Sequence, residues 1–207
     1  MLETFAHMDS VTLWTFMAAS LVMYLTPGAD MMFTIASGIS GGPKAGLAAT
    51  LGVTLGLLAH VTIAAAGLAV VIATSPAALL AIKYTGAAYL LVLSYQACTA
   101  KPLSDEIEGR ANILRAVRRG FLTNILNPKI ILFILAFLPQ FTTTEAGPIW
   151  QQIVILGGML ATGGFLVVSM IGLSAGIVGA KLKQATGILN KIAAVIFGGL
   201  AAKLVFD

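Results

Sequence analysis

The sequence predicts an all-α integral membrane protein with six transmembrane helices. Of its 207 residues, 58% are hydrophobic and only 10% are charged, and the mean hydropathy is +0.98. Soluble domains carry about 25% charged residues. Charge-free stretches recur along the chain, and a helix of about 20 such residues is long enough to cross a bilayer. These observations exclude a soluble globular protein.

The first helix is expected at about Val11–Ser37, with a break at Thr26-Pro27-Gly28 and with Asp30 just after the break. A proline inside a helix costs roughly 3 kcal/mol. An aspartate at the bilayer centre costs about 2.5 to 3.5 kcal/mol on insertion scales. Two such costs so close together indicate a functional site within the membrane.

The next stretch contains two further helices. Gly38–Lys44 is rich in glycine and proline and is predicted to be a turn. The charge-free stretch that follows is too long for one span, and Pro76 divides it because proline suits the first turn of a new helix. Helix 2 is therefore expected at about Ala45–Ala73 and helix 3 at about Ala77–Cys98.

The second half contains helices 4 to 6. Thr99–Arg119 is the only sustained polar stretch and is predicted to be an extramembrane loop with some helical content. Helix 4 is expected at about Gly120–Phe141, interrupted at Asn127-Pro128-Lys129. Helix 5 lies in the charge-free stretch between Pro148 and Ala180, and helix 6 is expected at about Gly187–Phe206.

The positive charges predict the orientation. The connections between helices 1 and 2, 3 and 4, and 5 and 6 carry Lys44, Lys101, Arg110, Arg115, Arg118, Arg119, Lys181 and Lys183. The N-terminal tail and the other two connections carry no lysine or arginine, and Lys203 near the C-terminus is the exception. By the positive-inside rule the basic connections are cytoplasmic, so both termini are expected outside.

A repeat is expected within a single membrane domain, residues 1–207. Its halves, about 10–99 and 120–207, flank the loop 100–119, and three helices per half invert the second half relative to the first. Thr26-Pro27 and Asn127-Pro128 occupy corresponding positions, each a capping residue before proline, which favours the start of a half-helix. Either motif alone is typical of an ordinary proline kink. Paired interruptions point to a transporter site near the membrane midplane.

The paired motifs predict a substrate site. Half-helix N-termini suit a carboxylate, so Thr26, Gly28 and Asn127 are expected to hold an anionic group. Asp30 is expected to hold a substrate ammonium or a proton, and the combination fits an amino acid. The residues predicted to bind substrate are Thr26, Pro27, Gly28, Asp30, Asn124, Asn127, Pro128 and Lys129.

The role of Asp30 has two alternatives. Carboxylates within membrane segments form proton relays, which favours Asp30 as the proton-coupling residue. A fixed ion pair with Lys129 is the structural alternative, and both roles are compatible in different conformations.

Three segments resemble a known family. TPGADMMFTIASGISGGPKAGLAATLGVTLG, KYTGAAYLLVLSYQA and RGFLTNILNPKIILFILAFLPQF resemble the lysine exporter and homoserine/threonine resistance (LysE/RhtB) family of bacterial amino-acid exporters. The resemblance covers nearly the whole chain, although many members have a second proline where this chain has Ala29. It implies a multi-pass protein of the bacterial inner membrane, with the termini predicted on the periplasmic side.

The resemblance also implies export of amino acids or close derivatives by proton antiport, without an organic cofactor and without enzymatic activity. The expected partners are an amino-acid substrate, protons and membrane lipid, and no nucleic acid. Glycine pairs at GxxxG spacing predict close helix contacts, either within the bundle or in a homodimer. These pairs are Gly42/Gly46, Gly52/Gly56 and Gly172/Gly176.

Other polar residues within the helices have structural alternatives. His60 has no second histidine or cysteine nearby, so a hydrogen bond between helices is favoured over metal binding or a proton relay. Four hydroxyl residues are candidates to line a pathway or to bond to their own helix. These are Thr50, Thr54, Thr162 and Ser169.

Functions other than amino-acid export match some features of the sequence. Gly38-Ile39-Ser40-Gly41 matches the GxSG pattern of an intramembrane serine protease. Ser40, however, is expected in a turn beside Lys44, with no histidine placed to pair with it. An aspartyl protease needs two membrane aspartates, and only Asp30 qualifies. In a non-transporting membrane subunit the paired motifs and Asp30 would have no purpose. The export of another small solute on the same fold stays an open alternative.

Overall fold

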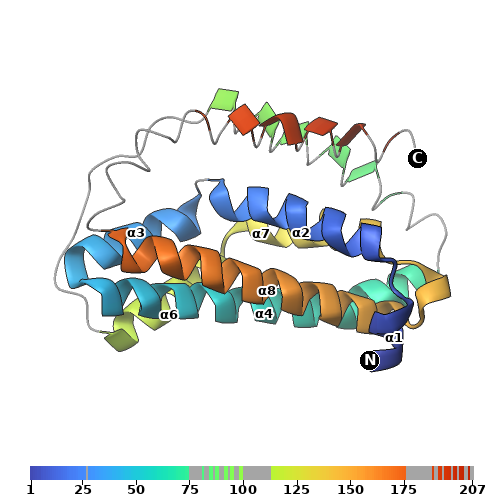
Figure 1. Ribbon diagram of the computed structural model, residues 1–207, viewed down its shortest axis with the longest axis horizontal. Coiled ribbons are helices and arrows are strands. Elements are labelled where there is room, and N and C mark those ends of the chain that lie inside the picture. Colours follow the sequence, from blue (N-terminus) through green and yellow to red (C-terminus); the bar gives the residue numbers. More distant parts are fainter. Residues whose placement is uncertain are drawn as a thin grey trace.

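The computed structural model describes residues 1–26, 28–74 and 113–175, with scattered helical positions between 81 and 99 and between 188 and 205. Every element in this described part is helical, and the long helices run side by side along one axis (Figure 1). The all-α prediction is therefore confirmed for this part of the chain. Most of the predicted helices 3 and 6, most of the loop 100–119, and Pro27 lie outside the described residues.

The first broken span consists of α2 (Ser10–Leu25) and α3 (Ala29–Gly41), which meet at an angle of 55°. A short helix, α1 (Leu2–His7), precedes it and was not predicted. The span ends later than the predicted Ser37, because the helix continues to Gly41. Gly42 then adopts a φ of +78°, a left-handed conformation that glycine tolerates and that ends the helix.

The second span, α4 (Pro43–Thr74), matches the predicted helix 2. The next described helices are α6 (Ile113–Ile125) and α7 (Pro128–Phe137), which form a second broken span. The bend measured from Ile113–Ile125 to Lys129–Phe141 is 60°. The short 3₁₀ helix η1 (Leu138–Phe141) continues this span.

The start of α6 bears out the helical content expected in the loop Thr99–Arg119 and moves the predicted boundary between this loop and helix 4. Residues 113–119 are helical, so the helix begins before the predicted Gly120. Ala116 is buried, whereas Arg115, Arg118 and Arg119 are exposed. The helix is therefore amphipathic, and the charged residues on its exposed face form the polar pattern that predicts a loop.

The fifth predicted helix corresponds to α8 (Ile149–Leu173), which ends before the predicted limit of Ala180. A 3₁₀ helix, η2 (Thr144–Ala146), lies in the connection that precedes it. The buried Gln152 side chain fixes this connection. Its Nε2 donates to the carbonyl oxygens of Thr143 at 2.7 Å and Gly147 at 2.8 Å, and its Oε1 accepts from the Thr143 N–H at 3.0 Å.

Two described helices, Pro43–Gly67 and Ile149–Leu173, are long and apolar enough to cross a membrane, and the count rises to four if each bent pair is one span. The sixfold count stays a prediction. One contact links positions from the predicted helices 3 and 6, because the Ser94 hydroxyl donates to the Ala194 carbonyl at 2.7 Å.

Glycines bring the helices into close contact. A Cβ on Gly46 would lie within 3.0 Å of the Gly172 carbonyl in α8. One on Gly52 would lie within 3.0 Å of the Val117 carbonyl in α6, and one on Gly56 would lie equally close to Asn124. These glycines thus act within the bundle. Among the other predicted members, a Cβ on Gly42 would meet no described atom within 4 Å, and Gly176 lies outside the described residues.

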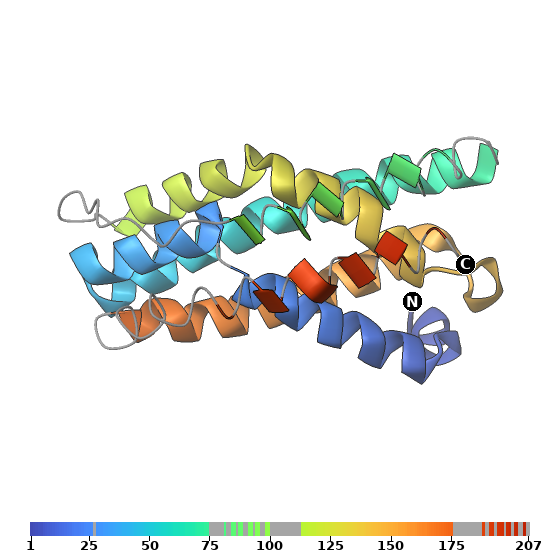
Figure 2. The ribbon, with the colours of Figure 1, turned by 90° about the horizontal axis from the view of Figure 1, so that it is seen from above.

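An aromatic cluster joins the two broken spans at the end of the bundle opposite Gly41. Phe16 of α2 packs on Phe137 of α7, with ring centroids 5.3 Å apart, and Phe133 and Phe141 extend the stack. Figure 2 shows α6 along one long side of the bundle and α2 along the other. The two breaks are thereby held facing each other across the interior.

Candidate substrate site

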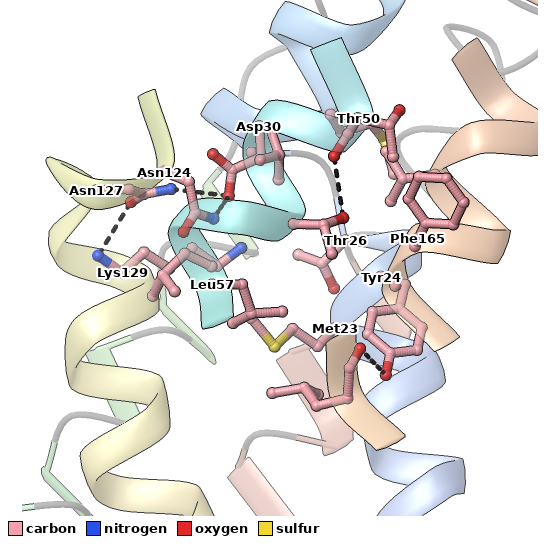
Figure 3. A pocket seen from close by; sticks show the side chains of 18 residues that line it. Met23, Tyr24, Thr26, Asp30, Thr50, Leu57, Asn124, Asn127, Lys129 and Phe165 are labelled. Carbon is pink, nitrogen blue, oxygen red and sulfur yellow. Dashed lines mark hydrogen bonds between the residues drawn. The ribbon is translucent and has the colours of Figure 1, made fainter. Parts of the chain in front are cut away.

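A pocket lies where the two broken spans bend (Figure 3). The space between its lining atoms, open solvent included, is about 650 Å³. Six of the eight predicted site residues line it, namely Thr26, Gly28, Asp30, Asn124, Asn127 and Lys129. Pro27 lies outside the described residues, and Pro128 is the first residue of α7. The structure thus brings both sequence motifs to one cavity.

The Asp30 carboxylate is bound on only one side. Its Oδ2 accepts from Nδ2 of Asn124 at 3.0 Å and from Nδ2 of Asn127 at 3.3 Å. Its Oδ1 is buried and has no hydrogen-bond partner among the described residues. The same holds for Oδ1 of Asn124, a residue only 1% exposed. Buried acceptors without a donor are costly, so these two oxygens favour a ligand that donates hydrogen bonds.

Asn127 caps α7 and also holds Asp30. Its Oδ1 accepts from the Lys129 N–H at 3.1 Å, the N-cap bond expected of asparagine before proline. Its backbone carbonyl accepts from the Ile130 N–H at 3.1 Å. The predicted start of a half-helix at Asn127-Pro128 is therefore confirmed. Because both polar atoms of the Asn127 side chain bond to the protein, the residue positions Asp30 relative to α7.

The start of α3 differs from the start of α7. Gly28 is its N-cap and makes no side-chain cap bond. A Cβ built on Gly28 would lie 3.5 Å from Nζ of Lys129, so the ammonium lies beside the positive end of the α3 dipole. Lys129 and Asp30 attract each other electrostatically within the same pocket. The Lys129 ammonium and the start of α3 are thus two positive features next to the Asp30 carboxylate.

His60 of α4 supports the kink from outside the pocket. Its Nε2 lies 3.3 Å from the Asn124 carbonyl oxygen. That carbonyl has no helical partner because Pro128, four residues later, lacks an N–H. The Asn127 N–H also donates to it at 2.9 Å. The prediction that His60 makes a hydrogen bond between helices is confirmed by this contact, for the tautomer with a proton on Nε2.

The hydroxyl residues divide into two groups. Thr50 and Thr54 line the pocket, and their hydroxyls donate to the carbonyls of Gly46 at 3.1 Å and Thr50 at 2.9 Å. These two residues therefore line the pocket and also bond to their own helix, which are the two alternatives predicted for them. Thr162 is exposed, and Ser169 is buried without a partner among the described residues. Neither of these two lines the pocket.

The rest of the pocket is largely apolar and was not predicted. Its walls include Met23 and Tyr24 of α2, Leu57 of α4, and Leu160 and Phe165 of α8. The Tyr24 hydroxyl donates to the Leu160 carbonyl at 2.8 Å, which joins α2 to α8. In a chain that is 58% hydrophobic, no sequence signal distinguishes an apolar pocket wall from a lipid-facing surface. Among the described residues, no group of histidine, cysteine, aspartate and glutamate side chains is placed to hold a metal.

Comparisons with known proteins give the family. The model of the LysE type translocator family matches residues 21–207. An uncharacterised membrane protein of Bacillus subtilis, YrhP, is 37% identical over 72% of this chain and 76% of its own length. The leucine efflux protein of Salmonella typhimurium is 30% identical over 97% of both chains. No solved structure matches. Because the family model and the leucine efflux protein both match most of its length, the chain belongs to the LysE type translocator family.

Proposed function

We propose that the protein exports amino acids or close derivatives across the bacterial inner membrane by proton antiport. The observation that carries this proposal is the pocket at the two breaks, which combines a carboxylate and an ammonium with acceptor oxygens that have no partner among the described residues. The likeness to a leucine efflux protein supports it. The proposed role is transport without a cofactor or a catalytic reaction.

Each charged group of an amino acid has complementary groups in the pocket. The substrate ammonium donates to Oδ1 of Asp30 and Oδ1 of Asn124, the two buried acceptors without a partner among the described residues. The substrate carboxylate lies by Gly28 at the uncapped start of α3, near Lys129, where the helix dipole and the ammonium favour an anion. Thr26 lines this end of the pocket. Pro128 serves by starting α7, and Asn127 serves by holding Asp30. A role of Pro27 in the site stays a prediction, because this residue lies outside the described residues.

The coupling of export to protons follows from Oδ1 of Asp30, the carboxylate oxygen that has no partner among the described residues. Two amides occupy Oδ2, so a proton and a substrate ammonium compete for Oδ1. A carboxylate that carries a proton no longer attracts the ammonium, and a bound ammonium keeps the proton away. Asp30 therefore carries the substrate in one direction and a proton in the other, but not both at once. This alternation is the requirement for exchange.

The helix directions support two inverted halves working by alternating access. α4 runs parallel to α6, because Gly52 lies by Val117 and Gly56 lies by Asn124. The inverted counterpart of this pair is α8 with the first broken span. In that pair Tyr24 lies by Gly164 and Gly38 by Gly172, so these elements are also parallel. The two breaks would then act as the matched hinges of the two halves.

The distribution of basic residues supports periplasmic termini. Gly120 of α6 lies against Ala49 of α4, so the exposed Arg115, Arg118 and Arg119 lie at the same end of the bundle as Lys44. We place this end in the cytoplasm by the positive-inside rule. Close contact between copies of the chain in a homodimer stays a separate proposal, because the described glycine contacts are internal.

The proposed export is tested with the purified full chain in inside-out vesicles. We expect accumulation of labelled amino acids when the vesicle interior is acidic, and loss of accumulation when an uncoupler collapses the proton gradient. A panel of amino acids and related small amines identifies the substrate. If none accumulates in response to the gradient, while another small solute does, the exporter of a different solute on the same fold is the correct function.

Ser40→Ala is expected to leave transport unchanged. In contrast to the predicted turn, Ser40 lies in the last turn of α3, and its hydroxyl donates to the Ala36 carbonyl of the same helix at 2.8 Å. His60, the histidine within the described spans, contacts the Asn124 carbonyl oxygen instead of Ser40. Uptake rates of the variant and the wild type decide this point. Loss of transport, together with proteolysis by the wild type only, would favour the intramembrane serine protease.

A further inference from the structure

The pocket has a charged end and an apolar end. Figure 3 shows Asp30, Asn124, Asn127 and Lys129 gathered toward one side, with Met23, Tyr24 and Phe165 toward the other. The charged end is built from the starts of α3 and α7 and the end of α6. The apolar end is built from α2, α4 and α8. A ligand that spans both ends therefore meets two different chemical environments.

The charges at the first end match those of a zwitterion. Among the described residues that line the pocket, Asp30 and Lys129 are the only charged side chains. The α-ammonium and α-carboxylate of one amino acid offer one charge of each sign to this end. A third charge on the substrate side chain would lie among apolar groups, and burying an unpaired charge is strongly unfavourable. Lysine and glutamate are therefore poor fits.

We infer that the pocket binds a neutral amino acid with an apolar side chain, directed toward Leu57, Leu160, Phe165 and Val168. The inference rests on the proposed export of amino acids and specifies its substrate class. Leu57 and Phe165 face the cavity from two different helices. Met23 and Met31 also line it, and the flexible methionine side chain adapts to the shape of its neighbour. Each methylene buried here strengthens binding about fourfold.

The test compares leucine, alanine, lysine and glutamate as competitors of labelled leucine uptake by the full chain in inside-out vesicles. We expect leucine to have an apparent affinity at least about tenfold higher than alanine, because its longer side chain buries more apolar surface. Lysine and glutamate are expected to compete weakly. Equal competition by lysine or glutamate overturns the inference and leaves the proposed export intact. Absence of gradient-dependent uptake of every amino acid overturns the proposed export, and the inference with it.

A variant of the apolar wall tests the position of the side chain. Phe165→Ala is expected to lower the apparent affinity for leucine by roughly 10-fold and that for alanine by less than about threefold, because alanine does not reach this wall. Leu166→Ala is the matched control, since Leu166 is the next residue of α8 and is 58% exposed. Equal losses for leucine and alanine in Phe165→Ala would overturn the inference. If this variant does not fold, the competition panel of the wild type still decides.

Discussion

Asp30→Asn is expected to abolish proton-coupled export while leaving the protein folded and inserted in the membrane. The asparagine side chain preserves the shape of aspartate, but it neither carries a proton in exchange nor attracts an ammonium by charge. Loss of a hydrogen bond to a charged group weakens substrate binding by roughly 10- to 100-fold. Initial rates of gradient-driven uptake in inside-out vesicles measure the effect, with insertion checked by the amount of protein in the membrane.

Asp9→Asn is the matched control for this substitution. Asp9 is exposed and caps α2 by accepting from the Thr12 N–H at 2.9 Å. Asparagine is an equally good N-cap, so the control should transport at the rate of the wild type. If Asp30→Asn transports at that rate too, Asp30 is not the proton carrier.

The double variant Asp30→Asn/Lys129→Gln separates the two predicted roles of Asp30. If the only role of Asp30 is a fixed ion pair, removing both charges relieves the penalty of the single variant. Stability should then recover, and the double variant should transport at least as well as the single variant Lys129→Gln, which lacks only the lysine. If Asp30 carries the proton, the double variant transports less than Lys129→Gln even where the thermal stability of the purified protein recovers. The comparison of these two measurements decides between the roles.

The polar part of the site could be predicted from sequence because polar residues stand out in a membrane helix. Thr26, Asp30, Asn127 and Lys129 interrupt apolar runs, and the pairing of the motifs indicated that they belong together. The structure places them in one pocket. Sequence could not show that the two half-helix starts differ, because the difference depends on which atoms the Asn127 side chain bonds to.

The apolar wall and the exact helix limits could not be predicted for a different reason. Leu57 and Leu58 are alike in sequence, but only Leu57 lines the pocket, whereas Leu58 is exposed. The α6 helix begins at Ile113 because Ala116 and Gly120 pack inward. That contact is tertiary, and the local charge of the stretch opposes a transmembrane prediction. Helix packing, and not local composition, therefore determines which leucine lines the pocket and where α6 begins.

Gly52→Ala is expected to destabilise the protein and reduce transport. A Cβ at this position would lie within 3.0 Å of the Val117 carbonyl and of the Phe121 backbone nitrogen. Both are backbone atoms, which have no alternative rotamer, so α4 and α6 must separate. Overpacking of this kind costs about 1 to 3 kcal/mol, sometimes more. The Tm and yield of the detergent-solubilised protein should both fall.

Gly67→Ala, also in α4, is the matched control, because a Cβ at Gly67 meets no described atom within 4 Å. There alanine should be neutral or stabilising, since its helix propensity exceeds that of glycine by about 1 kcal/mol. The expected reduction of transport in Gly52→Ala has a specific structural cause. One turn further along α4, Gly56 lies directly against Asn124, the residue that binds Asp30. If Gly52→Ala matches Gly67→Ala in both Tm and uptake, the α4–α6 contact does not position the site.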